Sequence, residues 1–325
     1  MTLNPLDLFA QMPGAVAQGL IWGIMAIGIY ITYKILDIAD LTVDGSLCTG
    51  GAVCVMLLLA GAPVSLALLG AFAAGVLAGL VTGIFHTICG ISAILAGILT
   101  QLGLWSVNLA IMGKANQSIN VNNYDLLVSL RYLQEVIKGT RPFYWSPIFV
   151  VGLFVLVIIA LLYWFFGTER GASIRATGAN PNMAQAQGIN TSFNKVLGLM
   201  LSNGIVALSG GLLAQYQGFA DINMGRGAIV IGLAAVIIGE VVFARIFRNF
   251  ALRLLGVVLG AIIYYMVMQS VLWLRLDSNY LKLLSALVVA IFLAIPHWKA
   301  SCRAAPRRMK GGFSNAENSS NPKDL

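Results

Sequence analysis

The sequence predicts an all-α fold, a polytopic membrane helical bundle of about nine (8–10) transmembrane helices. Hydrophobic residues make up 59% of the 325 residues, charged residues only 10%, and the mean hydropathy is +0.87. A soluble domain carries about 25% charged residues, so lipid must be the solvent for much of this chain. No Asp, Glu, Lys or Arg occurs from Gly45 to Gly113, and Phe149–Phe166 is an apolar run that ends in aromatic residues.

The individual spans follow from the length that a membrane helix needs, about 20 mostly apolar residues. Breaks at Ala62-Pro63 and around Cys89-Gly90 divide the uncharged region into three spans. The first of these is short, which is compatible with a broken or re-entrant helix. The expected spans are 15–35, 46–60, 63–85, 92–112, 149–166, 196–216, 227–244, 254–274 and 280–296.

The Lys and Arg residues predict the orientation, because cytoplasmic loops carry the excess of positive charge. With the C-terminus in the cytoplasm, 13 of the 20 Lys and Arg residues fall inside and seven outside. The loop 113–145 is then extracytoplasmic and the loop 167–195 cytoplasmic. We expect residues 1–298 to form the transmembrane domain. Residues 299–325 are expected to form a basic, polar and disordered cytoplasmic tail.

Composition also excludes several functions. The net charge of +8 comes from basic residues at span ends and in the tail, which lipid explains, so no nucleic-acid partner is expected. The four cysteines form no CxxC pair and the two histidines have no partner at ligand spacing. We therefore expect no metal, no cofactor and no catalytic residue.

The loop 167–195 contains the signals of one short helix. Asn180 can cap its first turn, Pro181 suits the first helical position, and Gly188 can adopt the left-handed conformation that ends it. Such a short helix is stable only when braced by its own protein or by a partner. Its small residues Ala184 and Ala186 would allow a partner to approach closely. From these signals alone, an ordinary cytoplasmic loop is equally compatible.

The same loop resembles the coupling segment of permeases from ABC importers of the branched-chain amino-acid, ribose and nucleoside type. The pattern Arg-Ala-x-Gly-x-Asn-x-x-Ala-Ala-x-x-x-Gly-Ile matches except at Met183, which replaces the first alanine of the pair. The residues that carry it are Arg175, Ala176, Gly178, Asn180, Ala184 and Gly188-Ile189. The resemblance extends from GLIWGIMAIGIYITYKILDIADLTVDGSLCTGGA to about Trp298. The turn DLTVDGS and the segment GFADINMGRG are most similar to a subgroup linked to uptake of amino acids, aromatic ones among them.

The resemblance implies a transport subunit and not an enzyme. Members of the family form the pathway for a small solute in the bacterial cytoplasmic (inner) membrane. They work with a second permease subunit, usually an identical one, with cytosolic ATPase subunits and with an extracytoplasmic substrate-binding protein. This sequence has no G-x-x-x-x-G-K-[ST] phosphate loop, so a partner must hydrolyse ATP. The residues implied to couple to the ATPase are Arg175, Gly178, Asn180, Pro181, Ala184 and Gly188.

Polar residues inside the spans are the candidates for the pathway, since they are costly to expose to lipid. Hydrogen bonding between helices explains them equally well. The candidates are Gln101, Asn108, Asn203 and Asp44.

Other carboxylates leave alternatives open. Asp37 and Asp40, like Asp44, follow the first span and fit either a gate or a solvated loop. Glu240 could relay protons, but pairing with Arg245 or Arg248, or snorkelling, explains it better. An ion-coupled secondary transporter is the alternative function, and it would require paired ionisable residues at mid-membrane. We find no such pair in the sequence.

Overall fold

The computed structural model describes residues 5–121, 124, 126–137, 142–243, 246–247, 249–273 and isolated positions between 283 and 294. For residues 5–10 and 143 it describes the backbone alone. The predicted helical bundle is confirmed in its class, since the described chain is mostly helical. The longer helices are α1 (Pro5–Tyr30), α2 (Val43–Leu59), α3 (Val64–Thr87), α4 (Ala93–Met112), α6 (Pro147–Gly167), α9 (Thr191–Gln217), α10 (Ala228–Phe243) and α11 (Phe250–Trp273).

Shorter elements occupy the connections between these helices. The π-helix η1 (Ile31–Ile35) continues α1, and α7 (Glu169–Ala179) and α8 (Pro181–Ala186) fill the connection between α6 and α9. The remaining short elements are β1 (Asn116–Ser118), α5 (Leu130–Ile137), the 3₁₀-helix η2 (Phe143–Trp145) and β2 (Phe219–Asp221).

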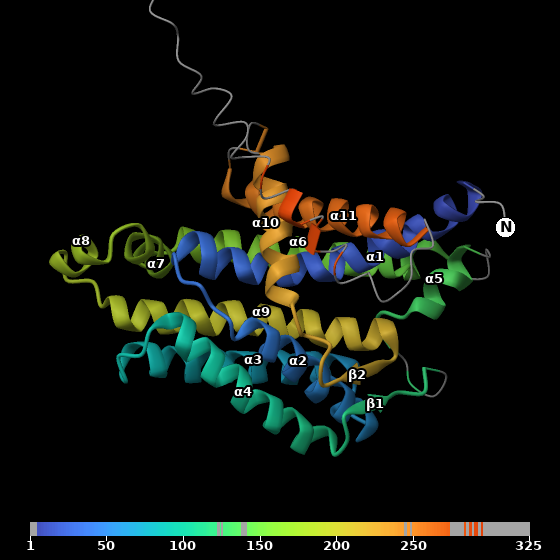
Figure 1. Ribbon diagram of the computed structural model, residues 1–325, viewed down its shortest axis with the longest axis horizontal. Coiled ribbons are helices and arrows are strands. Elements are labelled where there is room, and N and C mark those ends of the chain that lie inside the picture. The colour runs from blue at the N-terminus through green and yellow to red at the C-terminus, as the bar shows by residue number, and fades with distance from the viewer. Residues whose placement is uncertain are drawn as a thin grey trace, which may run out of the picture.

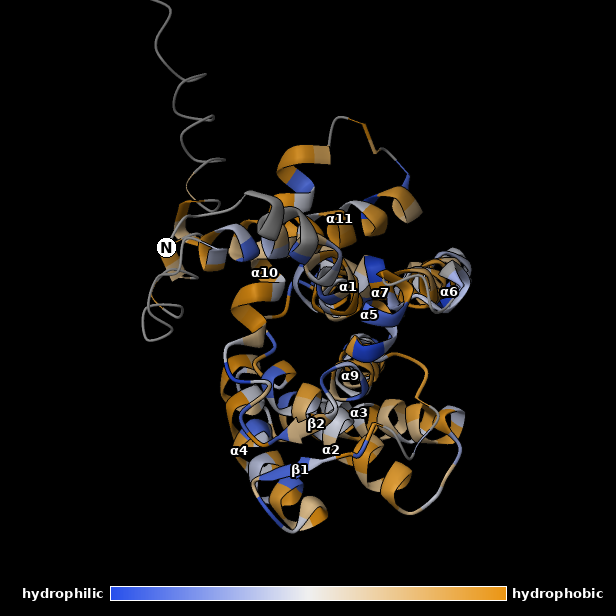
Figure 2. Ribbon diagram, turned by 90° about the vertical axis from the view of Figure 1, so that its right-hand side faces the viewer, coloured by the Kyte–Doolittle hydropathy of each residue, from blue (hydrophilic) through white to orange (hydrophobic). Residues whose placement is uncertain are grey.

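The long helices form two groups that meet where α1 packs against α9 (Figures 1 and 2). In one group, α9 packs against α2 and α3, and α4 covers α2. In the other, α1 packs against α6, α10 and α11. The two central helices are the most enclosed, with 83% of the apolar window of α1 and 72% of that of α9 buried. The outer helices α4 and α6 are only 22% and 28% buried.

The predicted spans coincide with observed helices for the first eight, while the ninth, 280–296, lies largely outside the described residues. Within the described part of the chain, six helices are long and apolar enough to cross a membrane, and two apolar helices, Val43–Leu59 and Ala228–Phe243, are shorter. The predicted count of nine is therefore not confirmed. The predicted tail 299–325 also lies outside the described residues.

The short α2 is entered through an irregular segment, residues 36–42, which leads from η1 into the bundle. Within this segment Thr42 and Asp40 are buried. The Thr42 hydroxyl is 2.7 Å from that of Thr82 on α3, which in turn donates to Thr100 on α4 at 3.0 Å. These side-chain contacts enclose the non-helical backbone of the segment within the protein.

The two ends of the bundle are built differently. α7 and α8 lie at one end of the long axis, here called the α8 end (Figure 1). At the opposite end, the β end, β1 and β2 pair antiparallel with Gln117 opposite Ala220.

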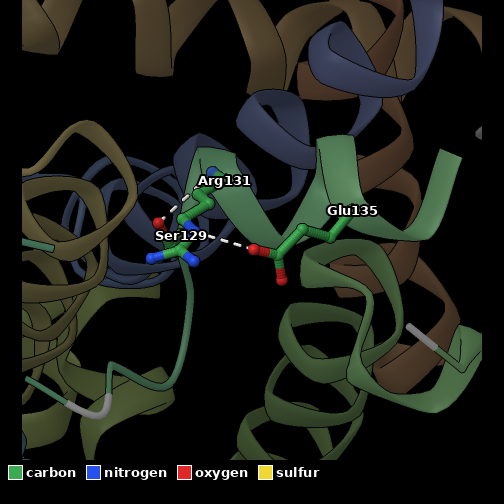
Figure 3. A network of polar contacts seen from close by, with 3 residues as sticks. All are labelled: Ser129, Arg131 and Glu135. Carbon is green, nitrogen blue, oxygen red and sulfur yellow. Dashed lines mark hydrogen bonds and ion pairs between the residues drawn. The ribbon is translucent and has the colours of Figure 1, made fainter. Parts of the chain in front are cut away.

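The short helix α5 carries a local set of polar contacts at the β end. Ser129 accepts a hydrogen bond from the Arg131 backbone at 3.3 Å, and Arg131 pairs with Glu135 one turn later at 2.7 Å (Figure 3). Such exposed pairs along one helix contribute about 0.3–0.5 kcal/mol. This pair therefore adds little to the stability of the bundle.

Candidate functional site

The short helix α8 has the caps that its sequence predicts. The Asn180 side chain accepts a hydrogen bond from the backbone N–H of Met183 at 3.1 Å. Gly188 has φ +79°, and its N–H donates to the Gln185 carbonyl at 2.9 Å. The next N–H, that of Ile189, donates to the Ala184 carbonyl at 3.0 Å. These paired bonds form a Schellman motif, so both ends of α8 are fixed by local chemistry.

The preceding helix α7 connects α8 to the rest of the bundle. Gly178 lies against the carbonyl of Ile35 in η1 so closely that a Cβ at this position would overlap the carbonyl oxygen. On another side of α7, the buried Asn194 of α9 donates to Ser173 at 2.6 Å and to Thr177 at 3.0 Å. α7 therefore contacts both η1 and α9.

Ala184 does not lie where its predicted role requires. It is only 4% exposed, so it cannot offer a small surface to a partner, and that part of the prediction is wrong. Ala184 is the buried residue of this six-residue helix and faces the protein itself. The outward face of α8 is formed by Asn182, Met183, Gln185 and Ala186 instead, and Met183 is 63% exposed.

A cavity of about 730 Å³ opens beside α7 at the α8 end and is lined by Arg175, Lys34 and Arg253. Lys34 forms an ion pair with Glu240 of α10 at 3.2 Å. The sequence does not indicate this partner, because Lys34 and Glu240 are 206 positions apart. Arg245 and Arg248, the partners predicted for Glu240, lie outside the described residues.

A buried polar network joins the irregular segment to the centre of α9. Asn203 donates to the Asp40 carboxylate at 2.7 Å and accepts from the Ser46 hydroxyl at 2.7 Å. Asp40 is 3% exposed and Asn203 is 0% exposed. Asp40 is thus not a solvated loop carboxylate, whereas Asp37 is exposed. Asn203 therefore forms hydrogen bonds between segments of the protein, which was the alternative to the prediction that it lines a pathway.

The other three predicted pathway residues converge on one small cavity at the middle of α4. It has a volume of about 120 Å³ and is lined by Asp44, Gln101 and Asn108. Both carboxylate oxygens of Asp44 accept hydrogen bonds from the start of α10, from the backbone N–H groups of Gly227 and Ile229 at 2.9 Å each. Asp44 therefore fixes the N-terminus of α10 against the first turn of α2.

The same cavity is lined by residues that the sequence analysis did not select as site residues, namely Cys48, Trp105, Asn223 and Arg226. Arg226 and Asn223 follow β2 in the segment GFADINMGRG, a polar stretch between the apolar helices α9 and α10. This polar stretch was the signal in the sequence that could have indicated a site. The sequence could not indicate that the stretch meets α4, because α4 lies more than 100 positions earlier in the chain.

The comparison with known proteins decides the family. Residues 12–295 match the family described as "Branched-chain amino acid transport system / permease component". The chain belongs to this permease family.

Two relatives match most of the permease. The "Tyrosine transport system permease protein" of Clostridioides difficile (strain R20291) is 39% identical over 277 residues, which are 85% of this chain and 88% of that protein. An uncharacterized protein of Rickettsia prowazekii (strain Madrid E) is 34% identical over 86% of this chain and 95% of its own length. The fructose import permease FrcC of Rhizobium meliloti is 26% identical over 62% of this chain and 54% of its own. The permease is accordingly a multi-pass membrane protein and the membrane component of a transport system.

Proposed function

We propose that this permease forms the pathway of an ATP-driven importer for an amino acid, with tyrosine or a similar aromatic amino acid as the substrate. The observation that carries the proposal is the 39% identity to a tyrosine transport permease over 88% of its length. The fructose relative is less similar and matches over only 54% of its length. An amino acid is therefore favoured over a sugar.

The partners follow from what the chain contains and lacks. Without a phosphate loop, the permease requires separate ATPase subunits, and these bind at the α8 end in the cytoplasm. An extracytoplasmic binding protein delivers the substrate to the β end, and a second permease subunit, an identical one in the simplest case, completes the pathway. The membrane is the bacterial cytoplasmic membrane. The C-terminus lies inside, in keeping with the excess of Lys and Arg on that side.

Coupling to ATP hydrolysis runs through α8. Its exposed face, around Met183 and Asn182, docks on the ATPase. The two caps stabilise the six-residue helix when the ATPase moves against it. Asn180 joins α8 to α7, and α7 contacts η1 through Gly178 and α9 through Thr177. Closure of the ATPases therefore moves α1 and α9 together. These are the two helices at the junction of the two helix groups.

Uptake of tritiated L-tyrosine by cells that express the permease with its ATPase and binding protein tests the function. We expect uptake that disappears when the phosphate-loop lysine of the ATPase is replaced by alanine. Uptake that survives this replacement would contradict an ABC importer and favour the ion-coupled alternative. A complex that imports fructose and not tyrosine would assign the sugar class instead.

A further inference from the structure

The cavity at the middle of α4 contains a polar atom that the protein itself leaves unused. Asn108 is 1% exposed, and its carbonyl oxygen has no hydrogen-bond partner within the described residues. Buried polar atoms are nearly always paired, and leaving one unpaired is unfavourable. An unpaired acceptor that lines a cavity is therefore suited to a donor that arrives with a ligand.

A positive charge lies on the same cavity. Arg226 lines it and forms no ion pair among the residues that the structure describes. The nearby Asp44 carboxylate does not neutralise Arg226 through a direct contact, since both of its oxygens bind backbone N–H groups of α10. The planar guanidinium presents donors that match the two oxygens of a carboxylate. The cavity thus combines a guanidinium that can bind a carboxylate with an unpaired carbonyl acceptor that favours an ammonium group.

An aromatic surface borders these groups. Trp105 lies one turn before Asn108 on α4, lines the cavity and is 48% exposed. The cavity, at about 120 Å³, is smaller than the roughly 300–1,000 Å³ of sites that enclose a whole ligand. It has room for the head group of an amino acid, and the side chain would then lie outside it, along the exposed indole.

We propose that this cavity is a contact site within the pathway for the head group of an α-amino acid. Arg226 binds the carboxylate, the Asn108 carbonyl accepts a hydrogen bond from the ammonium, and Trp105 packs against the side chain. This inference rests on the proposed function, since it assumes that an amino acid crosses the permease. It adds a selection step in the membrane, in which the permease recognises the feature that all α-amino acids share.

Uptake of tritiated L-tyrosine by the complete complex, normalised to the amount of permease in the membrane, tests these roles. We expect Arg226→Gln to lower uptake at least tenfold and Arg226→Lys to recover part of it, because the charge is restored without the fork. Asn108→Leu should lower uptake at least tenfold while the melting temperature in detergent changes little, because leucine of similar size removes the unpaired buried carbonyl together with the side-chain contact to Cys48. Lys114→Gln removes an exposed charge outside the cavity and should transport within twofold of wild type.

If wild type imports tyrosine and either Arg226→Gln or Asn108→Leu transports within twofold of it, the proposed site is wrong while the proposed function stands. If wild type imports no amino acid, the proposed function itself fails. A loss of uptake in Asn108→Leu that is accompanied by a lower melting temperature would assign Asn108 a structural role and would also overturn the proposal.

A labelling experiment tests binding without the binding protein. Asn223→Cys at the cavity is labelled with a maleimide in the purified permease–ATPase complex, in a background in which Cys89 and Cys302 are replaced by serine. Labelling of the same background without Asn223→Cys, which retains the buried Cys48 of the cavity, is subtracted. We expect L-tyrosine to slow labelling at least threefold. Tyramine, which lacks the carboxylate, and 3-(4-hydroxyphenyl)propionate, which lacks the ammonium, should not. Asn116→Cys on β1 is the control and should be insensitive to all three. Equal protection by tyramine and tyrosine, or none by tyrosine, would overturn the proposal.

Discussion

Asn203 illustrates how one side chain can hold two segments together. Its amide donates to Asp40 and to the Leu199 carbonyl, and its carbonyl accepts from Ser46. The Asn203 side chain and its three partners are all buried. A group that lost its partner here would stay away from water without a hydrogen bond, which destabilises the folded protein. The irregular segment 36–42 and the first turn of α2 therefore both depend on this one residue.

Replacing Asn203 with leucine should lower the stability of the permease. We expect a loss of about 1–3 kcal/mol, because the Asp40 carboxylate and the Ser46 hydroxyl would each lose a partner. The melting temperature in detergent measures the effect. Asn182→Leu, at an exposed position of α8, is the control and should change stability by less than about 0.5 kcal/mol. An unchanged melting temperature for Asn203→Leu would show that the network is not formed.

Gly178 is a residue at which a single methyl group should matter. Gly178→Ala would place its Cβ onto the carbonyl oxygen of Ile35 and force α7 away from η1. Overpacking of this kind costs about 1–3 kcal/mol, and transport should fall because α7 loses its contact with η1. Gly167→Ala is the matched control, since nothing lies within 4 Å of its added methyl. Transport by Gly178→Ala at the level of Gly167→Ala would contradict the close contact.

At the scale of single elements, the sequence of α8 predicts its caps but does not predict which of its residues are exposed. The caps at Asn180 and Gly188 could be predicted because they depend on the local backbone alone. The face that α8 presents depends on where α7 and α9 lie, and the prediction of an accessible Ala184 failed for that reason. Met183, the one departure from the family pattern that the sequence analysis noted, is among the most exposed large side chains at this end.

A charge on the outer face of α8 tests its role in docking. Met183→Asp should leave the folded permease intact, because Met183 is 63% exposed. It should reduce co-purification with the ATPase and the ATP hydrolysis that substrate stimulates, because a carboxylate would be desolvated at the interface. Met183→Leu, which keeps the apolar volume, should behave as wild type. Normal transport by Met183→Asp would show that this face of α8 does not contact the ATPase.

For the whole molecule, the proposed orientation, with the α8 end in the cytoplasm and the β end outside, predicts a labelling pattern. Asn116 in β1 and Asn182 in α8 are exposed and lie at opposite ends of the long axis (Figure 1). With Cys89 and Cys302 replaced by serine, we expect a membrane-impermeant maleimide to label Asn116→Cys on intact cells and Asn182→Cys only after permeabilisation. Labelling of Asn182→Cys alone on intact cells would reverse the orientation, and equal labelling of both would exclude a simple inside–outside arrangement.

The sequence by itself determined the membrane class, the positions of eight apolar helices and the caps of α8. Each of these depends on residues close together in the chain, through composition, apolar length or backbone geometry. Only the tertiary structure decided that Asn203 binds Asp40 and Ser46, that Lys34 meets Glu240 and that Asn108 shares a cavity with Arg226. These pairs lie more than 100 positions apart. In a membrane protein, the packing of helices against one another determines which polar groups meet, and the local sequence pattern does not.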